Sequence, residues 1–212
     1  IEFRLLNAVR EGVDSSYGPK FGPIGCIQTL EAARDHDHYQ APLGSGQGRG
    51  VATGYWFNIG GQTSATLNLS EDGSVALVVG TPDIGGTRAS LSMMAAETLG
   101  IELDKVRPLV GDTSALGYNM LTGGSRVTFA GGIAVVGAAE DLIRQLCERA
   151  ALTWDFSLDD VEWVDGEARP ANGRAGSEAP MSMAEIAKDM AKSGGPIVGR
   201  HSINAQGAGP SF

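Results

Sequence analysis

Cysteine, aromatic residues and positive charge are all scarce in this 212-residue sequence. Its two cysteines, Cys26 and Cys147, are too few for a disulfide framework or for a four-cysteine metal or iron–sulfur site. Phe, Trp and Tyr make up only 6% of the residues, and the net charge is −9. A duplex nucleic-acid binder would normally carry a clustered basic face, and the sequence has none, so no nucleic-acid partner is expected.

Long hydrophobic runs are also missing. The most apolar stretch, residues 130–139, is far shorter than the ~20 residues that a membrane span needs. The N-terminal segment IEFRLLNAVREG has no initiator Met, no basic n-region and no hydrophobic h-region. We therefore expect a soluble, cytoplasmic protein with reduced thiols and no membrane partner, represented here by an internal piece of a longer chain.

Glycine, by contrast, is abundant, with 31 residues spread along the chain. One glycine-rich loop, 80–88, lies between an apolar β-branched run that starts at Val75 and an amphipathic segment that ends before Gly100. The pattern predicts a strand, a glycine loop and a helix in that order. Such a junction directs backbone N–H groups and the positive end of a helix dipole at one point, which suits an anion. We call this loop the elbow.

A second loop, residues 112–126, resembles the elbow in composition. Both loops precede a predicted helix, and both contain hydroxyl side chains, glycines and one arginine, Arg88 or Arg126. Two helix N-termini that converge on one ligand would form a phosphate or pyrophosphate site, and arginine adds forked donors for anionic oxygens. Ordinary helix caps and turns explain the same residues equally well. The spacing matches neither the phosphate-loop motif nor the dinucleotide fingerprint, which excludes nucleotide hydrolysis of that type.

The remaining elements follow from periodicity and turn signals. Helices are expected over 3–9, 29–39, 87–99, 127–154 and 181–192. The expected caps are Thr29 for the second of these, Ser125 or Thr122 for the fourth, and Ser182 for the last. Strands are expected over 51–60, 63–70, 74–79 and 105–110, with a hairpin over 161–170 and strand character after 194.

No residue is expected to be catalytic or to bind a metal. His36, Asp37 and His38 lie together, but in a charged segment they indicate a solvated helix end, and no third or fourth ligand is apparent. His201 is isolated, and the three histidines define no triad. Glu97 would be a candidate base only if it were buried, and a surface position is expected for it.

The two loops resemble a known family. Residues 83–101, DIGGTRASLSMMAAETLGI, are similar to the segment written Gly-Gln-Gly-x-x-Thr in the large subunit of molybdenum hydroxylases, the xanthine dehydrogenase and aldehyde oxidase family. Asp112 and Thr113, followed by Gly124, Ser125, Arg126, Val127 and Thr128, are similar to the family's Asp-Thr step and Gly-Ser-Arg-x-Thr turn. The flanking segments also suit this subunit, so the resemblance covers essentially the whole chain.

The resemblance implies an oxidoreductase fragment that binds molybdopterin, alone or extended as a cytosine dinucleotide. Iron–sulfur centres and FAD would reside on partner subunits or domains, and the remainder of the large subunit would be a further partner. The implied reaction is hydroxylation of an aldehyde or N-heteroaromatic carbon with water as oxygen source. The implied cofactor-binding residues are Gly85, Gly86, Thr87, Arg88, Thr113, Gly124, Ser125, Arg126 and Thr128.

Two departures from the family pattern qualify this assignment. Gly86 stands where the family has a glutamine that reaches toward the cofactor, and the family's downstream Gly-Val-Gly-Glu motif, whose glutamate is the base, is not in this sequence. The fragment alone is therefore expected to be inactive. The alternative is a scaffold or subunit-interface domain that has lost cofactor binding.

The expected fold is α+β, a mixed sheet with helices packed on one face, of the molybdenum-cofactor-binding-domain type. Two parts are expected: residues 1–48, a helical and loop segment that continues an upstream domain, and residues 49–212, the truncated molybdopterin-binding domain.

Overall fold

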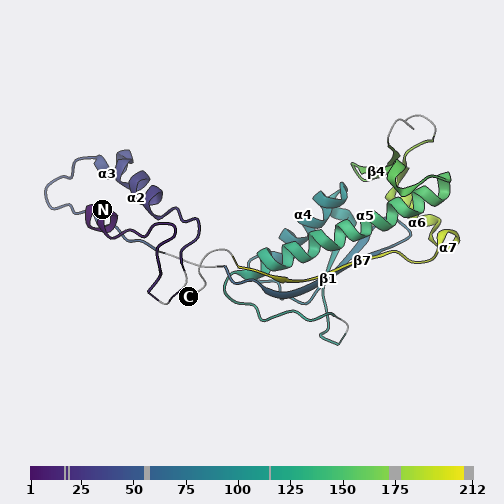
Figure 1. Ribbon diagram of the computed structural model, residues 1–212, viewed down its shortest axis with the longest axis horizontal. Helices are drawn as coiled ribbons and strands as arrows, with labels where there is room; N and C mark the ends of the chain where they lie inside the picture. The colour runs from purple at the N-terminus through teal and green to yellow at the C-terminus, as the bar shows by residue number, and fades with distance from the viewer. Residues whose placement is uncertain (17, 19, 55–57, 115, 172–177, 208–212) are drawn as a thin grey trace. The chain divides into compact units, whose positions relative to one another are not determined.

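A computed structural model describes residues 1–212 except 17, 19, 55–57, 115, 172–177 and 208–212 (Figure 1). The described residues fall into two compact units, one built mainly from residues 1–59 and the other from Gly60–Gln206. The division expected at 48/49 stays a prediction about the domain boundary. Among the helices in these described ranges, none has the length and apolar character needed to cross a bilayer.

The first unit contains three short helices, α1 (Glu2–Leu6), α2 (Cys26–Asp35) and α3 (Asp37–Gln40). Arg4 ties α1 to a later segment by donating to Thr53 Oγ1 at 2.8 Å and to the Val51 carbonyl at 3.0 Å. Thr29 is not the cap of α2, because the helix starts earlier, after Gly25. The strand expected over 51–60 is absent from its described parts, and its centre lies outside the described residues.

The second unit is organised around a four-stranded sheet in the order β3-β2-β1-β7. β1 (Gly61–Leu69) pairs antiparallel with both β2 (Val75–Val79) and β7 (Val198–Ala205), whereas β3 (Val106–Val110) runs parallel to β2. The expectation of a mixed sheet is confirmed.

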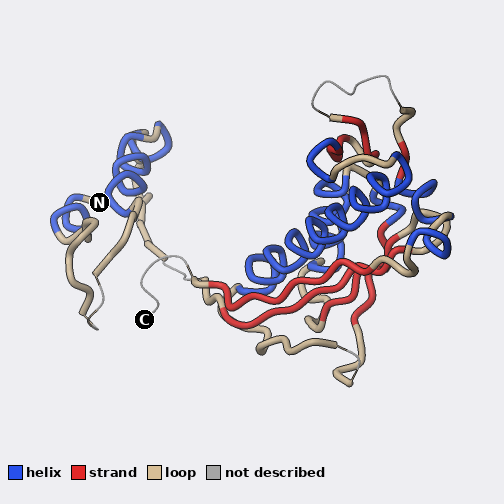
Figure 2. The backbone as a smooth tube through the Cα atoms, turned by 45° about the vertical axis from the view of Figure 1, so that its right-hand side comes forward, coloured by secondary structure: helices blue, strands red, loops and turns tan. Residues whose placement is uncertain are grey.

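Helices cover one face of this sheet, as expected (Figures 1 and 2). Alternate residues Ala65, Leu67 and Leu69 of β1 are buried, because strand side chains point alternately to the two faces and this set faces the helices. The covering helices are α4 (Thr87–Leu99) and α5 (Gly132–Trp154). The buried side of α4 includes Leu91 and Leu99, in the segment that the sequence predicts to be amphipathic.

The helix predicted from Val127 to about Trp154 is present, but its start is wound differently. Residues Val127–Gly131 (η2) form a π-turn that continues into α5, and its N-cap position is not occupied by Ser125 or Thr122. The residue at the N-cap position is Arg126, whose side chain makes no cap bond. Single π-turns at the start of a helix occur often at functional sites.

A smaller sheet, β4-β5-β6, completes the second unit. β4 (Val161–Val164) and β5 (Glu167–Pro170) form the predicted hairpin, and β6 (Met181–Ser182) leads into α6 (Met183–Lys188). Ser182 and Glu185 cap α6 reciprocally, which confirms the predicted cap. The helix predicted over 181–192 breaks at Asp189, after which α7 (Met190–Ser193) follows. Two short 3₁₀ turns, η1 (Leu103–Lys105) and η3 (Leu158–Asp160), precede β3 and β4.

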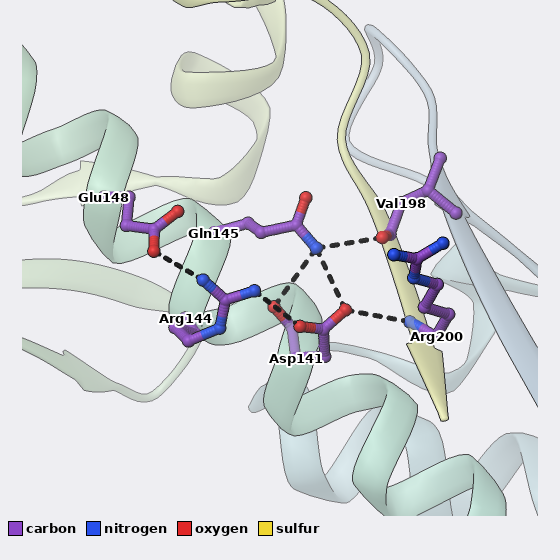
Figure 3. A network of polar contacts seen from close by, with 6 residues as sticks. All are labelled: Asp141, Arg144, Gln145, Glu148, Val198 and Arg200. Carbon is purple, nitrogen blue, oxygen red and sulfur yellow. Dashed lines mark hydrogen bonds and ion pairs between the residues drawn. The ribbon is translucent and has the colours of Figure 1, made fainter. Parts of the chain in front are cut away.

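Strand β7 lies at an edge of the main sheet, and side chains from α5 bind part of that edge (Figure 3). Asp141 accepts a hydrogen bond from the backbone N–H of Arg200 at 3.0 Å, and Gln145 donates to the Val198 carbonyl at 2.9 Å. Edge strands present unpaired backbone groups to solvent, and these two side chains satisfy one N–H and one carbonyl. The helix is thus fastened to the strand as well as packed on it.

Candidate functional site

Both predicted loops leave the sheet at the same edge. The elbow follows β2 and the second loop follows β3, and these two parallel strands are in register, with Val79 opposite Val110. The carboxyl ends of parallel strands therefore lie next to each other where the loops begin. In open α/β sheets this is the edge at which ligands commonly bind.

The second loop then returns to the main sheet beside the elbow. β2 ends at Val79, and the vacated position next to β1 is taken by the loop, whose Met120 N–H donates to the Gln62 carbonyl at 3.0 Å. Asn119 packs directly on Gly80: a β-carbon added to Gly80 would lie 2.7 Å from the Asn119 Nδ2 atom. The bases of the two loops are therefore in contact.

The helices that follow the two loops also pack together, with the start of α5 against the middle of α4. A β-carbon added to Gly132, at the start of α5, would lie 2.7 Å from the sulfur of Met94 in α4, and one added to Gly131 would lie 3.6 Å from Leu91. Glycine, which has no β-carbon, allows this close approach. The structure thus brings the elbow and the second loop to one region, as a shared site requires.

The tip of the elbow is built from two left-handed residues. Gly85 and Gly86 have φ of +65° and +78°, and a β-carbon at either position would meet no atom within 4 Å. Glycine is thus favoured here by the backbone conformation and not by crowding. Within the described part of the chain, the backbone N–H groups of Gly85, Gly86 and Thr87 have no protein acceptor. These are the open donors that an anion would need.

The side chains of Thr87 and Arg88 are directed to neighbours in the elbow itself. Thr87, which is buried, donates from Oγ1 to the Pro82 carbonyl at 3.3 Å. Asp83 accepts from the backbone N–H of Arg88 at 3.0 Å, and its other oxygen lies 3.6 Å from Arg88 Nε. Asp83 therefore caps α4 and partly neutralises Arg88. The sequence analysis missed this role, although an Asp shortly before a helix is a cap signal.

The second loop ends in a similar turn. Gly124 and Ser125 have φ of +61° and +56°, so a pair of left-handed residues lies close before this helix as well. A left-handed conformation is uncommon for a residue with a β-carbon and marks Ser125 as strained. Thr113 and Thr128 are exposed, so their hydroxyls are accessible. Near the start of the loop, hydrogen bonds from Ser114 lower the pKa of Asp112 and fix a turn there.

Arg126 requires a correction. The sequence analysis expected its guanidinium to donate to an anion, but the side chain is only 1% exposed and donates to neutral oxygens of the protein. Its five N–H donors have five acceptors: the carbonyls of Gly60, Met120, Leu121 and Gln62, and the hydroxyl of Thr63. A guanidinium has no more N–H groups than these, so none is left for a ligand.

Unsatisfied polar atoms and exposed apolar side chains surround the point where the loops meet. The Thr81 hydroxyl, next to Gly80, and the Asn119 Oδ1 atom are buried without a hydrogen-bond partner. Buried polar atoms normally have partners, which makes a water or ligand atom an expected neighbour. Several large apolar side chains are exposed around this point: Ile84 of the elbow, Leu109 and Val110 of β3, and Tyr118 and Leu121 of the second loop.

The other residues considered from sequence are not gathered into a site. His36 accepts from the His38 backbone N–H at 3.1 Å, which is a local turn contact. The His201 ring packs against Gly137 of α5, and Glu97 is exposed. Across the residues whose positions the structure gives, no group of three or more His, Cys, Asp or Glu side chains could hold a metal ion.

A comparison with protein families identifies the domain. Residues 29–212 match the family model described as the molybdopterin cofactor-binding domain. Since the match covers most of the chain, the protein belongs to this family. The resemblance noted from the two loop motifs is confirmed for this domain, and the chain is a molybdopterin cofactor-binding domain.

Solved structures share the fold. The Cu,Mo-CO dehydrogenase in its carbon monoxide reduced state matches with a TM-score of 0.65 and 23% identity over 72% of this chain and 21% of that chain. Aldehyde oxidoreductase from Desulfovibrio gigas matches with a TM-score of 0.62 and 21% identity over 95% and 20% of the two chains. Quinoline 2-oxidoreductase from Pseudomonas putida 86 matches with a TM-score of 0.57 and 19% identity over 68% of this chain and 19% of that chain. The chain therefore spans about a fifth of the length of these relatives.

Proposed function

We propose that the elbow and the second loop hold the phosphate-bearing part of a molybdopterin cofactor. The proposed cofactor-binding positions are those named from the sequence, with the exception of the buried Arg126: Gly85, Gly86, Thr87, Arg88, Thr113, Gly124, Ser125 and Thr128. The observation that carries the proposal is the elbow tip, where three successive backbone N–H groups are open at the start of a 13-residue helix. Backbone donors at a helix N-terminus are a favourable arrangement for binding phosphate.

The residues present fit such a group in further ways. A second turn of the same left-handed kind ends the second loop, whose Asn119 packs on Gly80 of the elbow, so two phosphates would each meet a helix start. This supports a cofactor in its cytosine dinucleotide form. The buried Arg126 adds a positive charge without a carboxylate partner among its five acceptors, and the orphan Thr81 hydroxyl is a further donor close to the junction of the loops.

The parent protein is proposed to be a molybdenum-dependent hydroxylase that oxidises an aldehyde or N-heteroaromatic carbon and takes the oxygen from water. The cofactor would supply the redox chemistry at its metal, whereas this chain's residues would bind and orient its phosphate end. The apolar side chains around the loops are proposed to contact the remainder of the large subunit. Iron–sulfur and FAD partners and a cytoplasmic location are part of the same proposal.

A non-catalytic scaffold is the competing function, and Gly86 is the residue that favours it. Gly86 has no side chain to contact a cofactor, where the family pattern has glutamine. However, Gly86 keeps its backbone N–H open, so the feature that binds phosphate is retained. Cofactor binding therefore fits the residues better than scaffolding alone.

A pair of variants at Gly86 tests cofactor binding. In the intact subunit purified from cofactor-producing cells, molybdenum would be measured by mass spectrometry and pterin by the fluorescence of its oxidised product. Gly86→Asp places a negative charge at the elbow tip, where nothing blocks the side chain. Repulsion of about 1–4 kcal/mol at contact distance should lower cofactor content roughly fivefold or more.

Gly86→Asn is the matched control, since asparagine has nearly the same shape, lacks the charge and tolerates the left-handed conformation. It should retain most of the cofactor. Equal content in both variants, or a wild-type subunit that contains neither molybdenum nor pterin, would contradict the proposed function and favour the scaffold.

A further inference from the structure

Arg126 is among the largest fully buried side chains of the protein, and its guanidinium joins two segments that are distant in sequence. On one side are oxygens of residues 60–63, at the start of β1: Nε donates to the Gly60 carbonyl at 2.8 Å, and Nη2 donates to the Gln62 carbonyl at 2.8 Å. On the other side is the end of the second loop, where Nη1 donates to the Met120 carbonyl at 3.0 Å and to the Leu121 carbonyl at 3.3 Å. The side chain therefore fastens the loop to the sheet.

The contact is closely packed. Thr63, itself 1% exposed, accepts from Nη2 through its hydroxyl, and a β-carbon added to Gly61 would overlap the sulfur of Met120. Because Arg126 is the residue immediately before the π-turn, its anchored side chain also fixes the backbone from which the next helix starts. The backbone at the end of the second loop is thus held at Arg126.

The charge of Arg126 is not neutralised by any of these partners. All five acceptors are carbonyl or hydroxyl oxygens, and no ion pair of Arg126 occurs among the described residues. Burial lowers the pKa of Arg126, but a guanidinium stays protonated in proteins. A buried cation without a carboxylate costs free energy, and an anion bound nearby reduces that cost.

We propose that Arg126 is a positioning residue for the anion-binding loop, which sets the loop against β1 and supplies a fixed positive charge while donating no hydrogen bond to the ligand. This inference rests on the proposed function for its ligand, a phosphate-bearing cofactor. It assigns to the side chain a role different from that of the open backbone donors at the elbow. Those donors contact the anion, whereas Arg126 acts through the loop and through its charge.

The test compares Arg126→Met with Leu146→Ala in the intact subunit. Met removes the donors and the charge but keeps an apolar side chain, and Leu146 is fully buried in α5, outside the site, so its truncation supplies a matched loss of stability. Three quantities would be measured: the thermal unfolding midpoint, the hydrogen exchange of residues 116–128 in cofactor-free protein, and the molybdenum and pterin content after expression with cofactor.

Arg126→Met is expected to speed exchange in residues 116–128 about tenfold or more and to lower cofactor content by a similar factor, whereas Leu146→Ala at a comparable unfolding midpoint leaves both near the wild-type level. Cofactor loss that follows the unfolding midpoint equally in both variants would overturn the proposal, because Arg126 would then be only structural.

Arg126→Lys separates the charge from the hydrogen bonds, since lysine keeps the charge but lacks the planar fork. Recovery of part of the cofactor content relative to Arg126→Met is expected, and content as low as in Arg126→Met would overturn the role of the charge. If wild-type protein contains no cofactor, the proposed function fails, but the exchange of residues 116–128 in cofactor-free protein still decides whether Arg126 sets the loop.

Discussion

The carboxylate of Asp141, in the middle of α5, accepts a hydrogen bond from the backbone N–H of Arg200 on the edge strand β7 at 3.0 Å. Its other oxygen accepts from Arg144 at 2.7 Å (Figure 3). A helix side chain thus takes the place of a neighbouring strand at one point of the sheet edge. Since the same helix begins at the second loop, the attachment of α5 to β7 also bears on how firmly the site is held.

Replacing Asp141 by Asn should destabilise the protein in a pH-dependent way. Burial opposes ionisation of Asp141, but hydrogen bonds from Arg144 and from the Arg200 N–H outweigh it, so its pKa is lowered. The ionised form therefore stabilises the fold at neutral pH, by about 1–3 kcal/mol for a charged hydrogen-bonded group. This stability is present above the unfolded value of about 3.9 and is lost as the pH falls through the lower folded value.

Chemical denaturation of the intact subunit at pH 7 and at low pH would measure the difference. The gap between wild type and Asp141→Asn should narrow on acidification. Glu148→Gln is the control, because Glu148 contacts only the exposed Arg144 in this network, and its loss should cost no more than about 0.5 kcal/mol. A gap that does not change with pH would contradict the role of the Asp141 charge.

Gly199→Ala should be one of the more damaging single substitutions. A β-carbon at Gly199 would overlap the carbonyl oxygen of Ala138 and would lie 2.7 Å from the β-carbon of Leu142, so β7 and α5 would have to separate. Overpacking of this kind costs about 1–3 kcal/mol or more. Gly131→Ala is the comparison, because its β-carbon would make only an ordinary contact with Leu91 at 3.6 Å. Similar denaturation midpoints for the two variants would show that the helix and strand can adjust.

Gly86→Gln tests the departure from the family pattern. The added side chain meets no atom within 4 Å, but it must adopt φ near +78°. The left-handed conformation costs about 1–2 kcal/mol for a residue with a β-carbon. We expect lower stability without loss of the fold, together with cofactor content at least equal to that of wild type, as measured by metal and pterin analysis. A decrease in content would mean that the elbow accepts glycine alone.

The two cysteines should differ in reactivity. Burial, together with the nearby negative charge of Glu148, raises the pKa of Cys147 to about 11, so at pH 8 only about a thousandth of this thiol is ionised. Cys26 is half-buried and therefore more accessible. Iodoacetamide labelling followed by peptide mass spectrometry should find Cys147 at least tenfold slower than Cys26 in the folded protein, and denaturation should remove the difference. Equal labelling of the folded protein would contradict the burial of Cys147.

Local patterns in the sequence predicted much of the second unit. The strands expected over 63–70 and 74–79 and the cap at Ser182 depend on signals within a few residues, so the sequence alone determines them. Gly100 ends α4 in the left-handed conformation that such a glycine predicts. The strand expected over 51–60 was wrong in its described parts, because β-propensity without a neighbouring strand does not determine a strand.

The site was harder to predict because its contacts are long-range. The loops could be recognised by composition, but the use of Arg126 depends on the carbonyls of Gly60 and Gln62, about sixty residues away in the chain. Asn119 was not selected at all, since nothing nearby in the sequence marks it as the residue that packs on Gly80. An arginine in a glycine-rich loop resembles an anion ligand whether it points toward solvent or into the protein.

The position of Met120 beside Gln62 has a consequence for the order of folding. The second loop docks where β1 extends beyond β2. We therefore expect the β1–β2 hairpin to form first, because it provides the surface that the loop joins. Closing so long a segment costs entropy that is recovered only at this last step. Folding is therefore expected to proceed from sheet to loop to ligand, and a chain that has not completed its sheet would not yet hold the second loop beside the elbow.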